Sequence, residues 1–205
     1  MSRAYRSSLR AEQAAATKRL ILDAARRVFR ERGYAGTTIA AVAEAADVAV
    51  PTVYASVGGK PAIVVELNEL ITQESAVPAA IQAIRTSPDP VEVVRLAVDV
   101  VRRIHEEFGD VIDVLRQAAP TEPDAAAGLA DGLRRHRMGF DLTAHRLEEL
   151  GALRKGMTPE QASEILGVLT MWGTWEAMVQ HYGWSWDAAA DWVVEVARAT
   201  ILRDP

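Results

Sequence analysis

The sequence predicts an all-α protein of about nine helices, in which a small three-helix domain precedes a larger helical one. Apolar residues recur at three- and four-residue spacing along the 205-residue chain, and no window alternates clearly enough to predict a strand. Hydrophobic residues make up 49% of the chain, enough to fill a core. Residues 1–60 carry ten Lys and Arg against five Asp and Glu, whereas the remainder carries 13 against 23.

This charge asymmetry indicates a head that binds a polyanion, although a solvated basic helix face is the alternative interpretation. The chain has no Cys, which excludes disulfides, thiolate metal sites and cysteine nucleophiles. No apolar run approaches the 18 or so residues of a membrane span. The basic N-terminus has no apolar core behind it, so it is not a secretion signal. We therefore expect a cytoplasmic protein that does not contact membranes.

Three short helices are expected in the head. Thr17 can cap the first helix, which ends at Gly33 because glycine readily takes the positive φ of a helix end. Thr37 or Thr38 caps the second, and Pro51 opens the third, where its missing N–H costs nothing. Two short helices joined by a three- or four-residue turn form a helix-turn-helix.

The third helix has room for only about two turns before Gly58, too few to be stable alone. Val53 and Val57, four residues apart, would face the first two helices. The other side chains would then face a DNA major groove and its phosphates, namely Thr52, Tyr54, Ala55 and Ser56. We interpret this helix as the one that reads DNA, supported from behind by its neighbours.

Residues 17–65, TKRLILDAARRVFRERGYAGTTIAAVAEAADVAVPTVYASVGGKPAIVV, resemble the DNA-binding domain of the TetR (tetracycline-repressor-like) family of bacterial regulators. The agreement runs through ILDAARRVFRERGYAGTTI, VAEAADV, PTVY and the lysine that follows; a generic three-helix packing module is the alternative. The resemblance implies a DNA-binding domain over residues 17–61. It also implies DNA contacts from eight residues: Thr38, Val50, Pro51, Thr52, Tyr54, Ala55, Ser56 and Lys60.

By this resemblance Thr38, Thr52, Tyr54 and Lys60 contact the DNA backbone, and the other four residues line the groove. The sequence departs from the family pattern at the turn, where Asp47 replaces the usual glycine, at the uncapped start of the third helix, and at Val57, where an aromatic residue is usual. The third helix also lacks Arg, Asn and Gln. Readout is therefore expected to use thymine methyls, hydroxyls and DNA shape.

Residues 1–16 are expected to form a flexible basic arm that carries Arg3, Arg6 and Arg10. Residues 62–205 are expected to form a helical ligand-binding and dimerisation domain. Proline and glycine positions predict further helices at about 60–73, 90–108, 111–115, 123–150, 158–183 and 185–202.

The last two helices are expected to pair with their copies in a homodimer, as the resemblance implies. The eighth helix carries small residues that allow a close helix approach, and the ninth carries an apolar stripe. A dimer would present two heads to a palindromic operator. The expected interface residues are Ser163, Gly167, Thr170, Thr174, Ala189, Val193, Val196 and Thr200.

A mostly apolar, aromatic cavity for a small hydrophobic effector is expected in the same domain. The expected lining consists of His105, Phe108, His136, Phe140, Met171, Trp172 and Trp175. For each residue alone, simple core packing is the alternative. The resemblance is the main reason for expecting a pocket.

No metal site, cofactor or catalytic residue is expected. His136 and His145 are nine residues apart, so they face opposite sides of one helix, and no glycine loop has P-loop spacing. The sequence is read as a dimeric transcriptional regulator, more a repressor than an activator, that an effector releases from DNA. A helical scaffold whose head no longer binds DNA and a helical enzyme are the alternatives.

Overall fold

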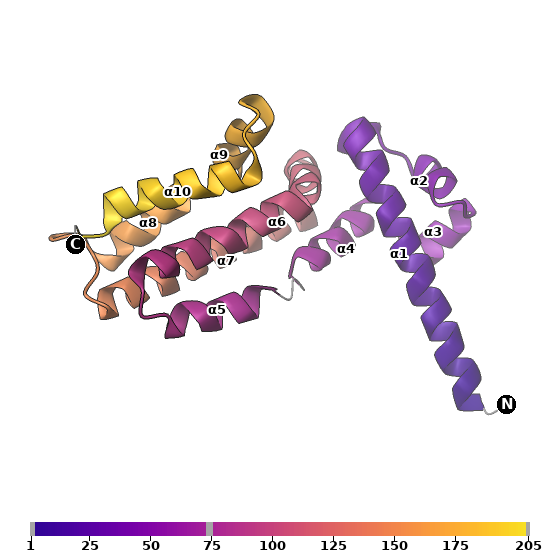
Figure 1. Ribbon diagram of the computed structural model, residues 1–205. Coiled ribbons are helices and arrows are strands. Elements are labelled where there is room, and N and C mark those ends of the chain that lie inside the picture. The colour runs from indigo at the N-terminus through magenta and orange to yellow at the C-terminus, as the bar shows by residue number, and fades with distance from the viewer. Residues whose placement is uncertain (1–2, 73–75, 204–205) are drawn as a thin grey trace. The chain divides into compact units, whose positions relative to one another are not determined.

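The computed structural model describes residues 3–72 and 76–203, with side chains described for 9–71 and 77–203. The described residues form ten α-helices and one π-helix, η1 (Figure 1). No strand occurs among them, only an isolated bridge between Leu153 and Leu202. The chain divides into two compact units, which are Met1–Gln73 with Gly109–Ala130, and Glu74–Phe108 with Asp131–Pro205.

The first four helices belong to the first unit. Their bounds are α1 (Arg3–Gly36), α2 (Ile39–Ala45), α3 (Val50–Ser56) and α4 (Lys60–Thr72). The fourth helix was predicted to end at Gln73, which lies outside the described residues. The remaining helices are α5 (Ala76–Thr86), α6 (Pro90–Ala118), α7 (Pro123–Glu149), α8 (Pro159–Leu169), α9 (Trp172–Glu176), η1 (Ala177–His181) and α10 (Trp186–Ile201).

Helix α1 begins much earlier than predicted. It starts at Arg3 instead of after Thr17, so most of the expected arm is helical, although the side chains of Arg3 and Arg6 lie outside the described ones. Thr17 is not an N-cap, because its hydroxyl donates to the Gln13 carbonyl one turn earlier, at 3.0 Å. The alanine-rich residues before it have the highest helix propensity, which explains the longer helix.

The turns between the head helices follow the sequence prediction. Gly33 has φ of 66° where α1 kinks, and Thr38 caps α2 by accepting a hydrogen bond from the Ala41 N–H at 3.2 Å. Asp47, in the turn before α3, has φ of 52° and is the only non-glycine residue with positive φ in the described chain. Ala49 gives α3 no side-chain cap.

The core of the first unit contains fully buried side chains from four helices, among them Ile21, Val42, Val53, Ile63 and Leu67. Helix α3 packs against both α1 and α2. These contacts supply the stability that a seven-residue helix lacks by itself.

The second unit corrects three predicted helix boundaries. Helix α6 continues through Gly109, where two helices were predicted, because burial there outweighs the cost of about 1 kcal/mol of one helical glycine. Helix α5 was not predicted; its only proline, Pro78, lies in the first turn, where proline is tolerated. The predicted eighth helix is broken after Leu169 into α8, α9 and η1.

One core joins the helices of the second unit. Its fully buried side chains include Phe140, Leu147, Leu166, Trp175 and Ile201, which come from α7, α8, α9 and α10. Among the described helices, no single one is long and apolar enough to span a membrane, while α2 and α3, bent by 99°, pass the same test as a pair by length and composition.

Replacing Asp47 by Gly should stabilise the protein by about 0.5–1 kcal/mol, because the left-handed backbone costs an L-residue more than glycine. Thermal unfolding followed by circular dichroism measures this as a higher midpoint. Asp47→Ala is the control and should lower the midpoint, since alanine tolerates positive φ less well than aspartate. A lower midpoint for Asp47→Gly would contradict the argument.

Candidate functional site

The exposed face of α3 carries the residues predicted to contact DNA. Val53 is fully buried, whereas Tyr54 is 56% exposed and Val50, Pro51 and Ala55 are also exposed. Thr52 and Ser56 are half-buried at the edge of this face. The arrangement leaves hydroxyl groups and small apolar side chains on the surface of a rigidly backed helix, a combination that can contact phosphates and thymine methyls.

Thr38 is exposed at the N-terminus of α2. Its oxygen accepts from the Ala41 N–H, so its hydroxyl hydrogen is free to donate to a further acceptor. That geometry suits a phosphate contact.

Lys60, the predicted phosphate-binding cation, already has a partner within the chain. Its Nζ donates to the Tyr34 carbonyl at 2.9 Å and lies 4.2 Å from the centroid of the Tyr34 ring. A phosphate would have to compete with this carbonyl for the ammonium group. The contact between Lys60 and Tyr34 leaves no signal in the sequence, because the two residues are 26 positions apart.

Tyr34 also joins the end of α1 to the end of α6 and to the turn that follows α6. Its N–H donates to Gln117 Oε1, and its hydroxyl donates to Glu122 Oε1, both at 2.9 Å. Burial, and then the Glu122 carboxylate, raise the pKa of the Tyr34 hydroxyl well above its ordinary value of 10. The hydroxyl therefore remains a neutral donor at physiological pH.

Two ion pairs attach α1 to neighbouring helices of the same unit. Arg26 makes a two-pronged contact with Asp110 of α6, at 2.7 and 3.0 Å, and Lys18 lies 2.6 Å from Glu66 of α4. Bidentate arginine–carboxylate pairs fix geometry better than single contacts. The last two turns of α6 are thus held to α1 at Arg26 and at Tyr34.

In the second unit, a polar network centres on Thr170, where α8 ends. Its hydroxyl donates to the Leu166 carbonyl at 2.8 Å and accepts from His136 Nε2 at 3.0 Å. Its carbonyl accepts from Trp175 Nε1 at 3.1 Å and from His105 Nε2 at 3.3 Å. Thr170 itself is fully buried, so these bonds satisfy polar groups that water cannot reach.

Most of the residues predicted to bind an effector lie around this network. His105 is close to the rings of Trp172 and Trp175, with centroids at 5.1 and 6.1 Å, and His136 meets Phe140 edge-on at 4.9 Å. Phe108 is buried, whereas Met171 is 43% exposed at the break between α8 and α9. The structure brings two histidines and two tryptophans together, and a role in ligand binding stays a prediction.

The residues predicted for the dimer interface are divided between core and surface. Ser163, Thr170, Ala189 and Val193 are buried within the single chain, and Gly167, Thr174, Val196 and Thr200 are half-buried. The buried residues have little surface to offer a partner subunit.

The small residues of α8 do allow a close helix approach, but to α7 of the same chain. Ser163 donates to Asp141 Oδ1 at 2.6 Å, and a Cβ added at Gly167 would lie 4.0 Å from the His136 ring. The sequence pattern did not identify this contact with α7, and a dimer contact through these residues stays a prediction. Exposed apolar side chains outside the predicted set include Val168, which is 69% exposed, and Trp192.

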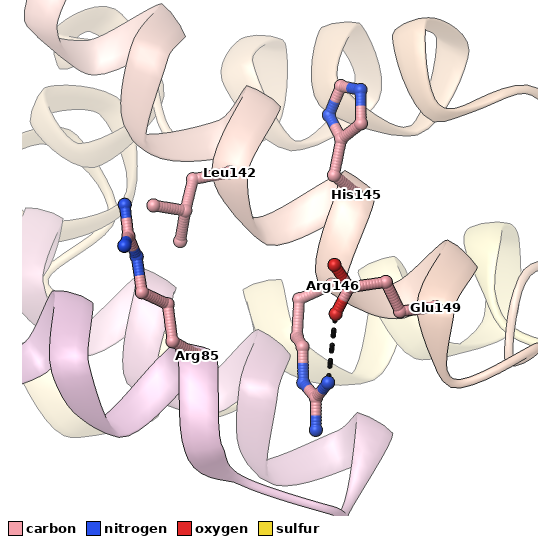
Figure 2. Close-up of a pocket in the computed structure, with 5 residues that line it drawn as sticks. All are labelled: Arg85, Leu142, His145, Arg146 and Glu149. Carbon is pink, nitrogen blue, oxygen red and sulfur yellow. Dashed lines mark hydrogen bonds and ion pairs between the residues drawn. The ribbon is translucent and has the colours of Figure 1, made fainter.

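Two surface pockets lie in the second unit, away from the predicted effector residues. One, of about 380 Å³, is lined by Arg85 of α5 and by Leu142, His145, Arg146 and Glu149 of α7 (Figure 2). Arg146 pairs with Glu149 at 2.9 Å, and a hydrogen bond to the Asp141 carbonyl raises the pKa of His145.

The second pocket is a groove of about 570 Å³ on the outer face of α8 and the loop before it. Its lining includes the apolar side chains of Ile165, Val168 and Leu169. Among the described residues, no group of three or more His, Asp or Glu could hold a metal ion.

Lowering the pH should destabilise the protein through His105. Burial lowers the folded-state pKa of this imidazole from 6.5 to about 4, so between these values the unfolded chain binds more protons and stability falls as pH falls. The loss should approach about 3 kcal/mol at the lower end of the window. Urea unfolding at several pH values measures it, and His105→Gln should weaken the dependence.

His136 contributes with the same sign, because burial lowers its pKa too, so part of the dependence should remain in His105→Gln. The exposed His181 is the matched control, and His181→Gln should leave the wild-type dependence intact. An unaltered pH dependence in His105→Gln would contradict the assignment.

No curated protein sequence is significantly similar to the chain. Solved structures do match it in fold. NalD of Pseudomonas aeruginosa, the secondary repressor of the MexAB-OprM multidrug efflux pump, is 21% identical with a TM-score of 0.73, covering 95% of this chain and all of its own. A putative transcriptional regulator from Saccharomonospora viridis, in complex with choline, is 17% identical with a TM-score of 0.76, covering 93% and 100%.

SmeT of Stenotrophomonas maltophilia, in its triclosan complex, is 20% identical with a TM-score of 0.70, covering 92% of this chain and 93% of that one. At these identities the structures establish the shared fold. Residues 21–67, from α1 to α4, match the family described as bacterial regulatory proteins, tetR family. The helix-turn-helix domain of this chain therefore matches the tetR family, and the whole chain shares the fold of the solved regulators.

Proposed function

We propose that this protein is a ligand-responsive repressor of transcription, released from a palindromic operator when a small hydrophobic molecule binds its second domain. The observation that carries the proposal is the outward face of α3, where Tyr54 and its neighbours are exposed while Val53 is buried. The basic charge of the first 60 residues supports attraction to DNA. Its site of action would be the cytoplasm.

Similar proteins support the finer parts of the proposal. NalD and SmeT are repressors of multidrug efflux pumps, and SmeT and the S. viridis regulator have been solved with triclosan and choline. By analogy, the unligated dimer would hold its two α3 helices at the spacing of operator half-sites. An effector that binds better to another spacing would shift the population and release the DNA.

The dimer in this proposal forms through α8 and α10. Residues that keep surface in the single chain are the better candidates for contacts, and Val168 in the α8 groove is the most exposed apolar residue among them. An exposed valine loses its unfavourable hydration when a second copy covers it.

Replacing Thr52 by Ala together with Tyr54 by Phe should weaken operator binding about tenfold to a hundredfold, since each lost hydroxyl contact is worth on the order of 0.5–1.5 kcal/mol. Gel shift on DNA from upstream of the gene measures the affinity across a salt series. The salt slope should not change, because neutral hydroxyls displace no counterions, whereas Lys60→Gln should reduce it by about 1.

The matched control for this experiment is Thr86→Ala with Tyr182→Phe, an exposed pair in the second unit that should leave affinity unchanged. Unaltered affinity in the Thr52/Tyr54 variant would refute the assignment of α3. Salt-insensitive or absent binding by the wild type would support the alternative of a helical protein whose head no longer binds DNA.

Replacing Val168 by Arg should convert the dimer to monomers, because it buries a charge in both copies at a position where the proposed interface covers an apolar side chain. Sedimentation velocity at micromolar concentration measures the change. Val65→Arg, at a partly exposed valine of α4, should leave the dimer intact. A Val168→Arg protein that remains dimeric would show that the interface does not include Val168. A monomeric wild type would contradict the proposal of a dimer on a palindromic operator.

A further inference from the structure

A buried and unpaired ring nitrogen lies among the aromatic residues of the second unit. His105 of α6 is only 8% exposed, and within the described part of the chain its Nδ1 is fully enclosed and has no hydrogen-bond partner. Leaving a buried polar atom unsatisfied costs on the order of 1–3 kcal/mol. Native proteins contain few such atoms, so each one calls for an explanation.

The hydrogen bonds around the ring fix what Nδ1 can do. A carbonyl can only accept, so the contact of Nε2 with the Thr170 carbonyl requires the hydrogen to be on Nε2. The ring is neutral near pH 7, because burial lowers its pKa to about 4. Nδ1 therefore carries a lone pair and is an acceptor that lacks a donor.

The surroundings of the ring are aromatic and uncharged. The indoles of Trp172 and Trp175 lie against it, and the second histidine, His136, is neutral as well, since burial lowers its pKa. His136 is also committed, because its Nε2 donates to the Thr170 hydroxyl. The acidic neighbours on the same helix, Glu106 and Glu107, are exposed to solvent.

These contacts disfavour an ionic ligand and suit a neutral one with an aromatic body. We infer that the effector carries a hydrogen-bond donor of the phenol type on an apolar aromatic body, and that His105 Nδ1 accepts its hydrogen. The inference rests on the proposed function, because it names the chemistry of the effector that the regulator would sense.

The helix break beside His105 gives a route to it. Trp172 is the first residue of α9, which has five residues and lies between the break at Met171 and the π-helix η1. So short a helix has little stability of its own, and π-turns are frequent at functional sites. Displacing Trp172, whose ring lies 5.1 Å from that of His105, would open the His105 ring to a ligand.

The test uses three phenols and their methyl ethers, which keep the aromatic body and lose the donor: triclosan, 1-naphthol and 4-hydroxybiphenyl. Binding to the full-length protein is measured by calorimetry and by tryptophan fluorescence, and release of operator DNA by gel shift. At least one phenol should bind about tenfold more tightly than its ether, as one well-placed hydrogen bond predicts.

Two substitutions separate the two nitrogens of His105. His105→Asn places an amide oxygen near the position of Nδ1, so the preference for the phenol should survive. His105→Gln places an amide N–H near the position of Nε2 and removes the δ acceptor, so phenol and ether should bind alike. His181→Gln is the matched control, and circular dichroism confirms that each variant is folded.

Equal binding of phenols and ethers to the wild type would overturn the inference. A preference for the phenol that persists in folded His105→Gln would overturn it too. Both results leave the proposed function unaffected. Failure of all six compounds to bind would also overturn the inference. That result is expected if Nδ1 accepts a hydrogen bond from water alone. The proposed function fails by a different result, namely the absence of specific operator binding by the protein without any compound.

Discussion

Burial of Val53 is the constraint on which the exposed face of α3, the proposed DNA-contact surface, depends. A seven-residue helix has no stability of its own, so α3 exists only because this side chain is fully enclosed where α3 packs on α1 and α2. One face of the helix is thereby committed to the core. The opposite face, with Tyr54 at its centre, is exposed and does not need to contribute to the stability of α3. The missing cap at Ala49 is tolerable for the same reason.

The end of α1 connects this reading unit to α6. The kink at Gly33 presents the Tyr34 N–H to Gln117, and a side chain at position 33 would collide with that same Gln117 oxygen, at 2.9 Å from an added Cβ. Glycine is favoured there by its positive φ, and a larger residue would also require the Gln117 side chain to move. Lys60 is held by the Tyr34 carbonyl, so one residue links a candidate DNA contact to the end of α6.

Helix α6 is continuous from Pro90 to Ala118 and carries both His105 and the anchors Asp110 and Gln117. His105 is hydrogen-bonded to the Thr170 carbonyl at the end of α8. The end of α8 is therefore bonded to α6, the helix whose later residues contact α1.

The sequence by itself determined the all-α class, the helix-turn-helix and the exposed residues of α3, because those features depend on local periodicity, caps and turn residues. The tertiary structure alone decided that Lys60 rests on Tyr34, that the small residues of α8 pack against α7, and that α6 passes through Gly109. Each of these contacts joins residues far apart in the chain. A pattern of small or apolar residues predicts that a helix packs closely, but it does not identify the element that the helix packs against. The break at Thr170 belongs with them, since buried side-chain donors stabilise a carbonyl that the helix leaves unpaired.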